Sequence, residues 1–207
     1  MNYYPVYLNL RGKKAVVAGG GNVAERKALA LLKAGAAVAV VSPELTERLG
    51  YLKKKGKITH IRRQYKKGDL RNAFIVVACT SSEKTNTEIA RNAKCLVNVV
   101  GTPSEGNFIV PSTVKRGHLT IAVSTGGVSP AVSKAIRKEL EKLYGREFAH
   151  YLRALVQMRR KAIKKIKDIK KRRKKFKDLA SEEMFNILRS KGFKAASEKV
   201  RQLFDRG

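Results

Sequence analysis

A glycine-rich turn near the start of the chain has the residue types that bind a phosphate group. Gly19, Gly21 and Ala24 occupy the three small positions of the pattern G-x-G-x-x-G/A. Gly19 permits a tight turn, Gly21 lets a pyrophosphate approach the backbone, and Ala24 lets a helix pack close to a strand. The N–H groups at the start of that helix then face the anion. Such a match indicates a dinucleotide site only in the right structural context and is otherwise a structural turn.

The segments around the turn supply that context. The apolar run Lys14–Ala18 predicts a buried strand, and Asn22–Lys33 has the apolar periodicity of a helix, with Gly35 as its stop. Ala37–Val41 predicts a second buried strand. A strand, a helix and a strand in this order form a crossover unit with parallel pairing. The sequence therefore favours a dinucleotide site over a structural turn.

The residues after the second predicted strand bear on the choice of dinucleotide. An acidic residue that holds the ribose of NAD usually ends this strand, about twenty residues after the glycines. Ser42 and Pro43 stand there instead, and Glu44 follows two positions late. Glu44 or a backbone group can still hold the ribose. No arginine directly follows the strand to favour a 2′-phosphate, since Arg48 is the nearest, and NAD is favoured over NADP.

The alternation of strands and helices continues to residue 100. A helix is expected over residues 42–56, with Ser42 as its N-cap and Pro43 in its first turn. The other expected elements are strands at 57–63, 73–80 and 95–100 and a serine-capped helix at 81–94. This pattern predicts an α/β fold with an open, mostly parallel sheet.

The pattern changes after Gly101. We expect a strand at Leu119–Val123 and, after a glycine turn, a helix from Ser129 to Leu143. Beyond residue 146 the helical period dominates. Ile163, Ile166 and Ile169 are spaced by three, which predicts one helix face, and Gly192 separates a last short helix.

Composition limits the function classes. Hydrophobic residues make up 43% of the 207 residues, and no apolar run approaches the ~18 residues of a membrane span. The N-terminus lacks a signal pattern, so a cytoplasmic location is expected. Cys79 and Cys95 have no metal-ligand spacing and are interpreted as buried small hydrophobic residues. The sequence predicts no metal site.

Several stretches together resemble a known family. They are "YYPVYLNLRGKKAVVAGGGNVAERKALALLKAGAAVAVVSPE", "VNVVGTPSEGNFIVPS" and "LTIAVSTGGVSPAVSKAIRKELE". In this order and spacing they resemble the NAD-dependent precorrin-2 dehydrogenase module, which occurs alone and within siroheme synthases. The resemblance covers roughly residues 3–145. The remaining third matches only in being helical.

The resemblance implies a fold, an activity and a set of site residues. The implied domains are an NAD-binding Rossmann domain at 1–112, a small α+β dimerisation segment at 113–145 and a helical, basic C-terminal domain at 146–207. The implied activity is oxidation of precorrin-2 to sirohydrochlorin in siroheme or cobalamin biosynthesis, by a homodimer that passes hydride to NAD⁺. The cofactor contacts would fall on Asn22, Val23, Pro43 and Glu44. The tetrapyrrole contacts would fall on Asn98, Ser124, Thr125 and Gly126.

One position departs from the family pattern. The larger synthases carry an aspartate directly after "NVV", proposed as general base and metal-handling group, and Gly101 stands there in this chain. A carboxylate accepts protons and binds cations, so its loss argues against metal insertion. Dehydrogenation is less affected, because the protein mainly positions the cofactor. No catalytic residue is assigned. The proton can leave to water, to a substrate carboxylate or to Glu105, a weak candidate.

The net charge of +30 leaves further alternatives open. Residues 158–177 contain thirteen basic residues and one acidic residue, which suits a solvated helix face, attraction of an anionic substrate, or a bound polyanion. No nucleic-acid-binding motif accompanies them, and neither a membrane nor a nucleic acid partner is expected. The leading hypothesis is an NAD-dependent precorrin-2 dehydrogenase. The alternatives are a bifunctional dehydrogenase and sirohydrochlorin ferrochelatase, and a nucleotide-sensing protein that binds nucleic acid through the basic tail.

Overall fold

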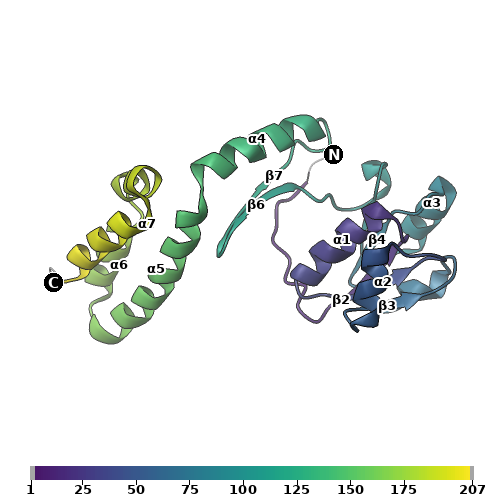
Figure 1. Ribbon diagram of the computed structural model, residues 1–207, viewed down its shortest axis with the longest axis horizontal. Coiled ribbons are helices and arrows are strands. Elements are labelled where there is room, and N and C mark those ends of the chain that lie inside the picture. The colour runs from purple at the N-terminus through teal and green to yellow at the C-terminus, as the bar shows by residue number, and fades with distance from the viewer. Residues whose placement is uncertain (1–2, 206–207) are drawn as a thin grey trace. The chain divides into compact units, whose positions relative to one another are not determined.

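The computed structural model describes residues 3–205. The chain forms two compact units, Met1–Val110 and Pro111–Gly207 (Figure 1). Each unit has its own hydrophobic core.

The first unit is built on a five-stranded sheet with the strand order β3-β2-β1-β4-β5. All neighbouring strands pair in parallel; Val16 of β1, for example, pairs with Ala39 of β2 and with Val76 of β4. The predicted parallel α/β sheet is confirmed. The strands are β1 (Lys14–Ala18), β2 (Ala37–Val41), β3 (Ile58–Ile61), β4 (Ile75–Ala78) and β5 (Leu96–Val99).

Both faces of this sheet are covered. Ala15 and Val17 of β1 belong to one apolar cluster, together with residues of α1 (Asn22–Lys33). Val16 and Ala18 belong to a second cluster, together with Ile89 of α3 (Glu83–Asn92). Strands buried on both faces read as continuous apolar runs, which is why they could be located from the sequence.

The predicted start of the second helix is wrong. α2 spans Glu47–Lys54, and its N-cap is Thr46, whose hydroxyl oxygen accepts a hydrogen bond from the N–H of Leu49. Ser42 is buried instead, and its hydroxyl donates to the carbonyl oxygen of Glu44 at 2.6 Å. Residues 42–46 therefore form a loop at the end of β2. The serine cap expected for α3 is confirmed at Ser82.

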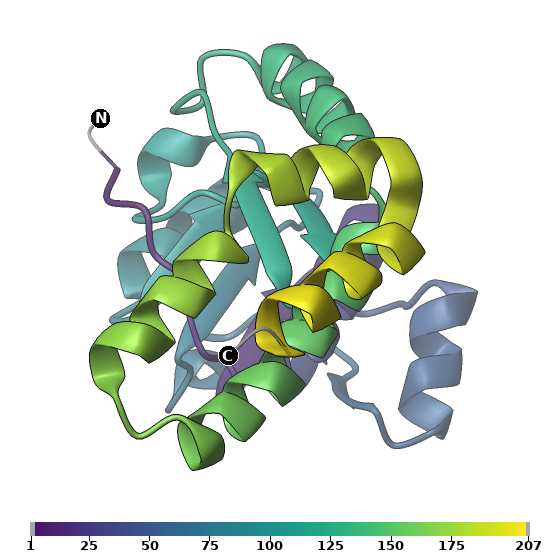
Figure 2. The same cartoon turned by 90° about the vertical axis from the view of Figure 1, so that its left-hand side faces the viewer.

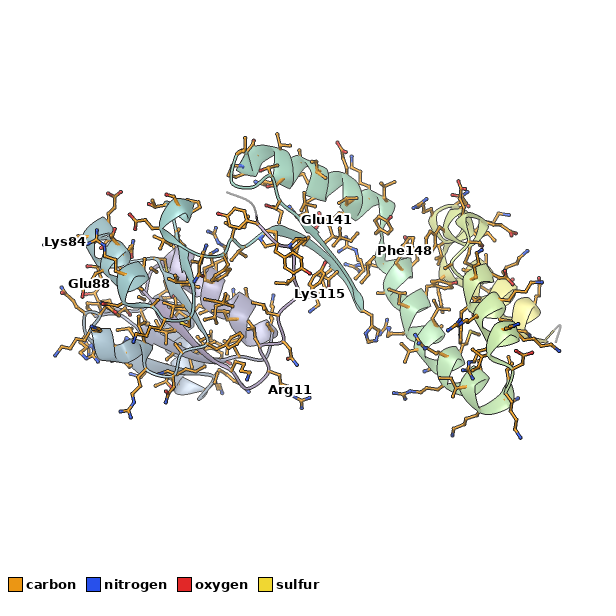
Figure 3. The ribbon with its side chains drawn as sticks, turned by 180° about the vertical axis from the view of Figure 1, so that it is seen from behind. Arg11, Lys84, Glu88, Lys115, Glu141 and Phe148 are labelled. Carbon is orange, nitrogen blue, oxygen red and sulfur yellow. The ribbon has the colours of Figure 1, made fainter. Side chains whose placement is uncertain are left out.

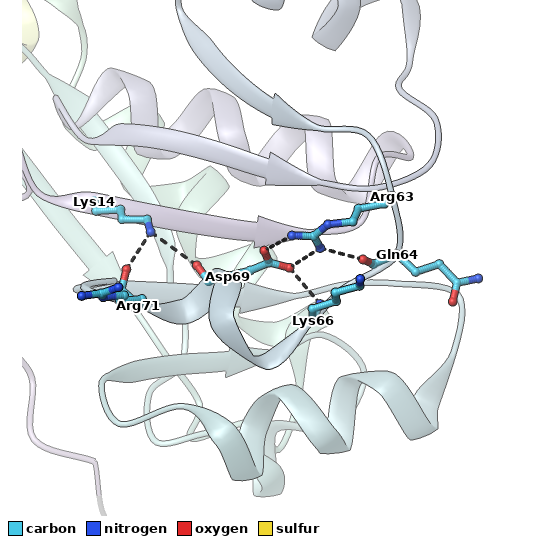
Figure 4. A network of polar contacts seen from close by, with 6 residues as sticks. All are labelled: Lys14, Arg63, Gln64, Lys66, Asp69 and Arg71. Carbon is cyan, nitrogen blue, oxygen red and sulfur yellow. Dashed lines mark hydrogen bonds and ion pairs between the residues drawn. The ribbon is translucent and has the colours of Figure 1, made fainter.

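A polar network fixes the connection between β3 and β4, which contains a 3₁₀ turn, η1 (Lys67–Leu70). The guanidinium of Arg63 donates two hydrogen bonds to the buried carboxylate of Asp69, at 2.8 and 2.6 Å. The ammonium of Lys14 donates to the carbonyl oxygens of Asp69 and Arg71 (Figure 4). This network ties the chain after β3 to the start of β1. A second 3₁₀ turn, η2 (Pro103–Glu105), follows β5.

The second unit begins with a two-stranded antiparallel ribbon of β6 (Ser112–Arg116) and β7 (Leu119–Val123) (Figure 2). β7 was predicted and β6 was not, because "STVKR" is short and mostly polar. α4 (Pro130–Leu143) contacts both strands. Its predicted cap is confirmed, since Ser129 accepts a hydrogen bond from the N–H of Val132 at 3.3 Å.

Three helices complete the second unit: α5 (Arg146–Lys165), α6 (Ile169–Asp178) and α7 (Glu182–Asp205). Phe148 of α5 (Figure 3) packs in a core with residues of α7, and the hydroxyl of Tyr151 donates to the carbonyl oxygen of Leu179 at 2.6 Å. The predicted separation at Gly192 is confirmed, because Gly192 adopts a left-handed φ of 75°.

The predicted single isoleucine face is wrong. α5 ends before Ile166, and α6 begins at Ile169. Ile163 and Ile169 are both more than half exposed. The three isoleucines therefore lie on both sides of a break between α5 and α6. Their spacing by three in the sequence does not indicate this break. Within residues 3–205, no helix is long and apolar enough to cross a membrane.

Candidate functional site

A cavity of about 1010 Å³ opens at the carboxyl ends of the strands in the first unit. Ligands of parallel α/β sheets bind at this edge. Four segments line the cavity, one after each of the strands β1, β2, β3 and β4. Its lining consists of residues 19–24, 41–46, 64–65 and 79–82, with Thr85 and Glu88 from α3.

The glycine turn after β1 has the conformation that a phosphate site requires. Gly19 has a φ of 124°, and a Cβ there would meet the carbonyl oxygen of Cys79 at 2.5 Å. Gly21 is the N-cap of α1 and offers no side chain to its first-turn N–H groups. A Cβ at Gly21 would point into open space. The start of α1 is therefore open to an anion, and the turn fits the pyrophosphate of a dinucleotide.

The loop after β2 is held against this turn. A side chain at Gly20 would collide with the carbonyl oxygen of Glu44. The N–H of Thr46 donates to the carbonyl oxygen of Gly20 at 3.0 Å, and the Thr46 hydroxyl donates to the carboxylate of Glu25 at 2.7 Å. Pro43 and Glu44 are exposed and line the cavity. The Glu44 carboxylate can accept hydrogen bonds from a ribose.

The charge of the lining bears on the choice of dinucleotide. Among the described residues that line the cavity, none is lysine or arginine, and Glu44 and Glu88 are both acidic. The 2′-phosphate of NADP needs a cationic partner, whereas a free ribose needs hydrogen-bond acceptors. The lining therefore suits NAD better than NADP.

Cys79 lies at the end of β4 and lines the cavity. It is half-buried rather than fully buried, which corrects its prediction, and Cys95 is also half-buried. Burial raises the pKa of the Cys79 thiol to about 11, against the opposing charge of Lys27. The thiol is therefore protonated at neutral pH and is a poor nucleophile.

Asn98 does not line this cavity. It is buried in β5, and its side-chain amide donates to the carbonyl oxygen of Phe108 at 3.1 Å. The neighbouring Asn107 accepts a hydrogen bond from the N–H of Val97 at 2.8 Å. In this structure Asn98 thus holds the segment after η2 against the sheet.

Gly101 and Glu105 follow β5 and also lie outside the cavity lining. Gly101 has a φ of 93°, and a Cβ there would meet nothing within 4 Å. The carboxylate of Glu105 accepts a hydrogen bond from the hydroxyl of Thr87 at 2.8 Å. Among the described residues, no group of three histidine, cysteine or acidic side chains forms a metal site.

The other predicted substrate residues belong to the second unit, in the turn between β7 and α4. Ser124 accepts a hydrogen bond from the N–H of Gly126 at 3.1 Å, and Gly126 has a φ of 65°. The Thr125 hydroxyl donates to the carbonyl oxygen of Ser129 and accepts from its N–H, both at 3.0 Å. These bonds give the turn a defined shape, in which Ser124 is exposed and Thr125 is half-buried.

Several residues of the cavity lining were not predicted, among them Gln64, Tyr65, Thr85 and Glu88. Tyr65 accepts a hydrogen bond from the side-chain amide of Asn92 at 3.3 Å, and Glu88 lies on α3 (Figure 3). The parallel order of the strands was a usable signal. It places the chain after β3 at the same edge as the glycine turn.

Two family models match the chain. A model described as putative NAD(P)-binding matches residues 6–112, and one described as sirohaem biosynthesis protein central matches residues 116–143. The first covers the whole of the sheet and cavity. The second covers most of the β6–β7 ribbon and α4.

Two curated proteins are similar in sequence. The precorrin-2 dehydrogenase of Bacillus subtilis is 37% identical over 159 residues, which cover 76% of this chain and 98% of that protein. The siroheme synthase of Nitrosococcus oceani is 38% identical over 168 residues, which cover 77% of this chain. The chain spans only 36% of that longer protein.

A solved structure of SirC, a precorrin-2 dehydrogenase, is similar over nearly the full length of both chains. The match has a TM-score of 0.82 and 26% sequence identity, and it covers 97% of this chain and 100% of the other. The likeness therefore includes the helical C-terminal region, where the sequence alone showed only a helical pattern.

Proposed function

The chain belongs to the NAD(P)-binding family that includes precorrin-2 dehydrogenase and the siroheme synthases, and on this premise we propose that it oxidises precorrin-2 to sirohydrochlorin with NAD⁺. The observation that carries this proposal is the cavity at the open start of α1, in a chain that matches 98% of the Bacillus subtilis precorrin-2 dehydrogenase. The coverage of the longer synthases is partial. Their additional activities are therefore not assigned to this chain.

The residues of the first unit hold the cofactor in this proposal. The first-turn N–H groups of α1, at Asn22 and Val23, bind the pyrophosphate, and Gly19 and Gly21 keep the approach clear. Glu44, beside Pro43, accepts hydrogen bonds from the ribose. When bound, NAD⁺ supplies the hydride acceptor. The protein's own contribution is to fix the position of the dinucleotide and to supply backbone N–H groups to its pyrophosphate.

The substrate is a polycarboxylate, and the charge of the chain suits it. A net charge of +30 raises the local concentration of an anion near the protein. We assign Ser124 and Thr125, through their hydroxyls, and Gly126, through its backbone, to substrate binding. Asn98, whose amide is bonded to the carbonyl oxygen of Phe108, would act by holding the segment after η2 in place. Lysine and arginine side chains pair with the substrate carboxylates.

The released proton does not require a protein carboxylate in this proposal. Gly101 supplies no side chain, and the carboxylate of Glu105 is engaged by Thr87. The proton passes to water or to a carboxylate of the substrate. The same missing group argues against metal insertion, because a carboxylate is a natural ligand for the incoming cation. The proposal is therefore a dehydrogenase without chelatase activity.

We also propose that the protein is a cytoplasmic homodimer. A two-stranded ribbon is marginal on its own in water, and α4 carries partly exposed Val132, Ile136 and Leu143 beside the β6–β7 ribbon. Pairing of these surfaces in two copies would bury them. Light scattering of the wild type and of Ile136→Lys tests this: a dimer that the substitution converts to a monomer supports it, and a monomeric wild type contradicts it.

The activity is tested by mixing purified protein with precorrin-2 and NAD⁺ under anaerobic conditions. Formation of sirohydrochlorin well above the rate without protein supports the proposal. A matched reaction with sirohydrochlorin and Fe²⁺, without NAD⁺, tests chelatase activity separately. Rapid metal insertion there would favour the bifunctional alternative.

A further inference from the structure

We propose that the end of the cavity after β3 is a base-reading subsite, in which the side-chain amide of Gln64 recognises the adenine of the dinucleotide. The inference rests on the proposed binding of NAD⁺ and goes beyond it, because it assigns a specificity determinant that the glycine turn does not contain. The subsite consists of Gln64 and Tyr65, which follow β3, and of Thr85 and Glu88, which belong to α3.

The order of the strands places the base at this end. The pyrophosphate lies at the start of α1, after β1, and the ribose lies at the loop after β2. The next strand outward is β3, since the sheet order is β3-β2-β1. Pyrophosphate, ribose and base follow one another in a dinucleotide, and the base therefore falls at the segment after β3. Gln64 and Tyr65 are the residues of this segment that line the cavity.

The backbone of Gln64 is fixed from outside the cavity. Arg63 donates a hydrogen bond to the carbonyl oxygen of Gln64 at 2.9 Å. The same guanidinium holds the buried carboxylate of Asp69 through two hydrogen bonds, at 2.8 and 2.6 Å. Figure 4 shows the side chain of Gln64 extending away from the Arg63–Asp69 pair. The network thus positions Gln64 without using its side-chain amide.

The amide of Gln64 has the chemistry to recognise adenine. It makes no hydrogen bond to any residue that the structure describes, so its donor and acceptor are available to a ligand. A glutamine amide pairs with adenine through two bonds, accepting from the 6-amino group and donating to N7. Hypoxanthine has an oxygen in place of the amino group, and the same amide can then make only one of the two bonds.

The carboxylate of Glu88 reinforces this preference. Tyr65 is half-buried and is anchored by the amide of Asn92, which also donates to the carboxylate of Glu88 at 3.4 Å. A carboxylate accepts hydrogen bonds and repels a carbonyl oxygen. Glu88 therefore also favours an amino group over an oxygen on the base.

The test is binding, measured by calorimetry with the full-length protein and without precorrin-2. The two ligands are NAD⁺ and nicotinamide hypoxanthine dinucleotide. We expect the wild type to bind NAD⁺ about tenfold more tightly, which is near the low end for a bidentate side-chain–base pair. Gln64→Ala should bring the ratio of the two dissociation constants close to one by weakening NAD⁺. Gln64→Glu lacks the N–H donors and should weaken the binding of both ligands, but its carboxylate still accepts from the 6-amino group and repels the hypoxanthine oxygen, so this variant should keep the preference for NAD⁺. Gln157→Ala, in α5, is the matched control and should leave the ratio unchanged.

Asp69 acts in this proposal as a positioning residue. Asp69→Asn should reduce the ratio of dissociation constants as well as the thermal stability, whereas a merely structural role would change stability alone. An unchanged ratio in Gln64→Ala would overturn the base subsite while leaving NAD⁺ binding intact. Failure of the wild type to bind NAD⁺ at all would overturn the proposed function together with the subsite.

Discussion

The hydroxyl of Thr46 donates a hydrogen bond to the carboxylate of Glu25 at 2.7 Å, and this bond joins the loop after β2 to the first turn of α1. The pyrophosphate and ribose contacts proposed here lie on these two segments. Thr46 also caps α2. One side chain thus fixes the distance between two parts of the cofactor site.

Replacing Thr46 by valine tests this link. Loss of an N-cap hydroxyl costs about 1 kcal/mol of stability, and loss of the bond to Glu25 should also weaken NAD⁺ binding severalfold. Calorimetry and thermal melts measure the two effects separately. Ser129→Ala removes the cap of α4 in the other unit and serves as control; it should destabilise the protein without weakening NAD⁺. Equal NAD⁺ affinities in both variants would show that the link has no role in binding.

Gly20 and Gly21 are neighbours with opposite expected responses to alanine. Gly21 has open space at its Cβ and an ordinary φ of −84°. Gly21→Ala should therefore keep its melting temperature and lose most of its NAD⁺ affinity, because the methyl group occupies the pyrophosphate approach. Gly20→Ala should lower the melting temperature strongly, because its Cβ would collide with the carbonyl oxygen of Glu44. Tight NAD⁺ binding by Gly21→Ala would contradict the assigned phosphate position.

Gly101 can be given the carboxylate that the longer synthases carry. Gly101→Asp has space for its side chain but places a non-glycine residue at a φ of 93°, at a cost of about 1–3 kcal/mol. We expect no acceleration of Co²⁺ insertion into sirohydrochlorin by the wild type and a measurable rate in the variant. Gly56→Asp, at a φ of 64° in a remote turn with similar space, controls for backbone strain. A wild type that inserts metal as fast as Gly101→Asp would show that the carboxylate is dispensable.

The Arg63–Asp69 pair should make the stability of the fold depend on pH in the acid range. Hydrogen bonds from Arg63 hold the pKa of the Asp69 carboxyl below its usual value of 3.8. A lowered pKa in the folded state contributes stability above the usual value, and this contribution is lost as the pH falls through the folded pKa. The melting temperature of Asp69→Asn should therefore lie below that of the wild type at pH 7, and the difference should shrink below pH 3.8. The exposed Asp178→Asn should show no such difference. A gap that stays constant into strong acid would contradict the pairing.

Much of the first unit could be predicted from the sequence. The predicted ranges Lys14–Ala18, Asn22–Lys33 and Ala37–Val41 agree with β1, α1 and β2 at every boundary. Buried parallel strands are continuous apolar runs, and the helix between them ends at a glycine with a φ of 84°. Local sequence patterns are enough to locate a strand when both of its faces are buried, because a continuous apolar run then marks it.

The start of α2 and the end of the cavity after β3 were not predicted correctly, because tertiary contacts determine both. Ser42 looks like a helix cap in the sequence, but its hydroxyl bonds to the Glu44 carbonyl, and Thr46 becomes the cap because it also reaches Glu25. Gln64 belongs to the cavity only because β3 lies beside β2. Whether such a residue lines the cavity depends on which strands are neighbours in the sheet, and no local motif marks it. This end of the site could therefore not be predicted from the sequence.

The central claim is tested most directly by recording NADH and sirohydrochlorin together in one anaerobic reaction with precorrin-2 and NAD⁺. Both products should form at equal rates with the wild type, and both rates should fall sharply in Gly21→Ala, which keeps its fold. Sirohydrochlorin formation that proceeds without NADH, or no formation above the rate without protein, would contradict the claim.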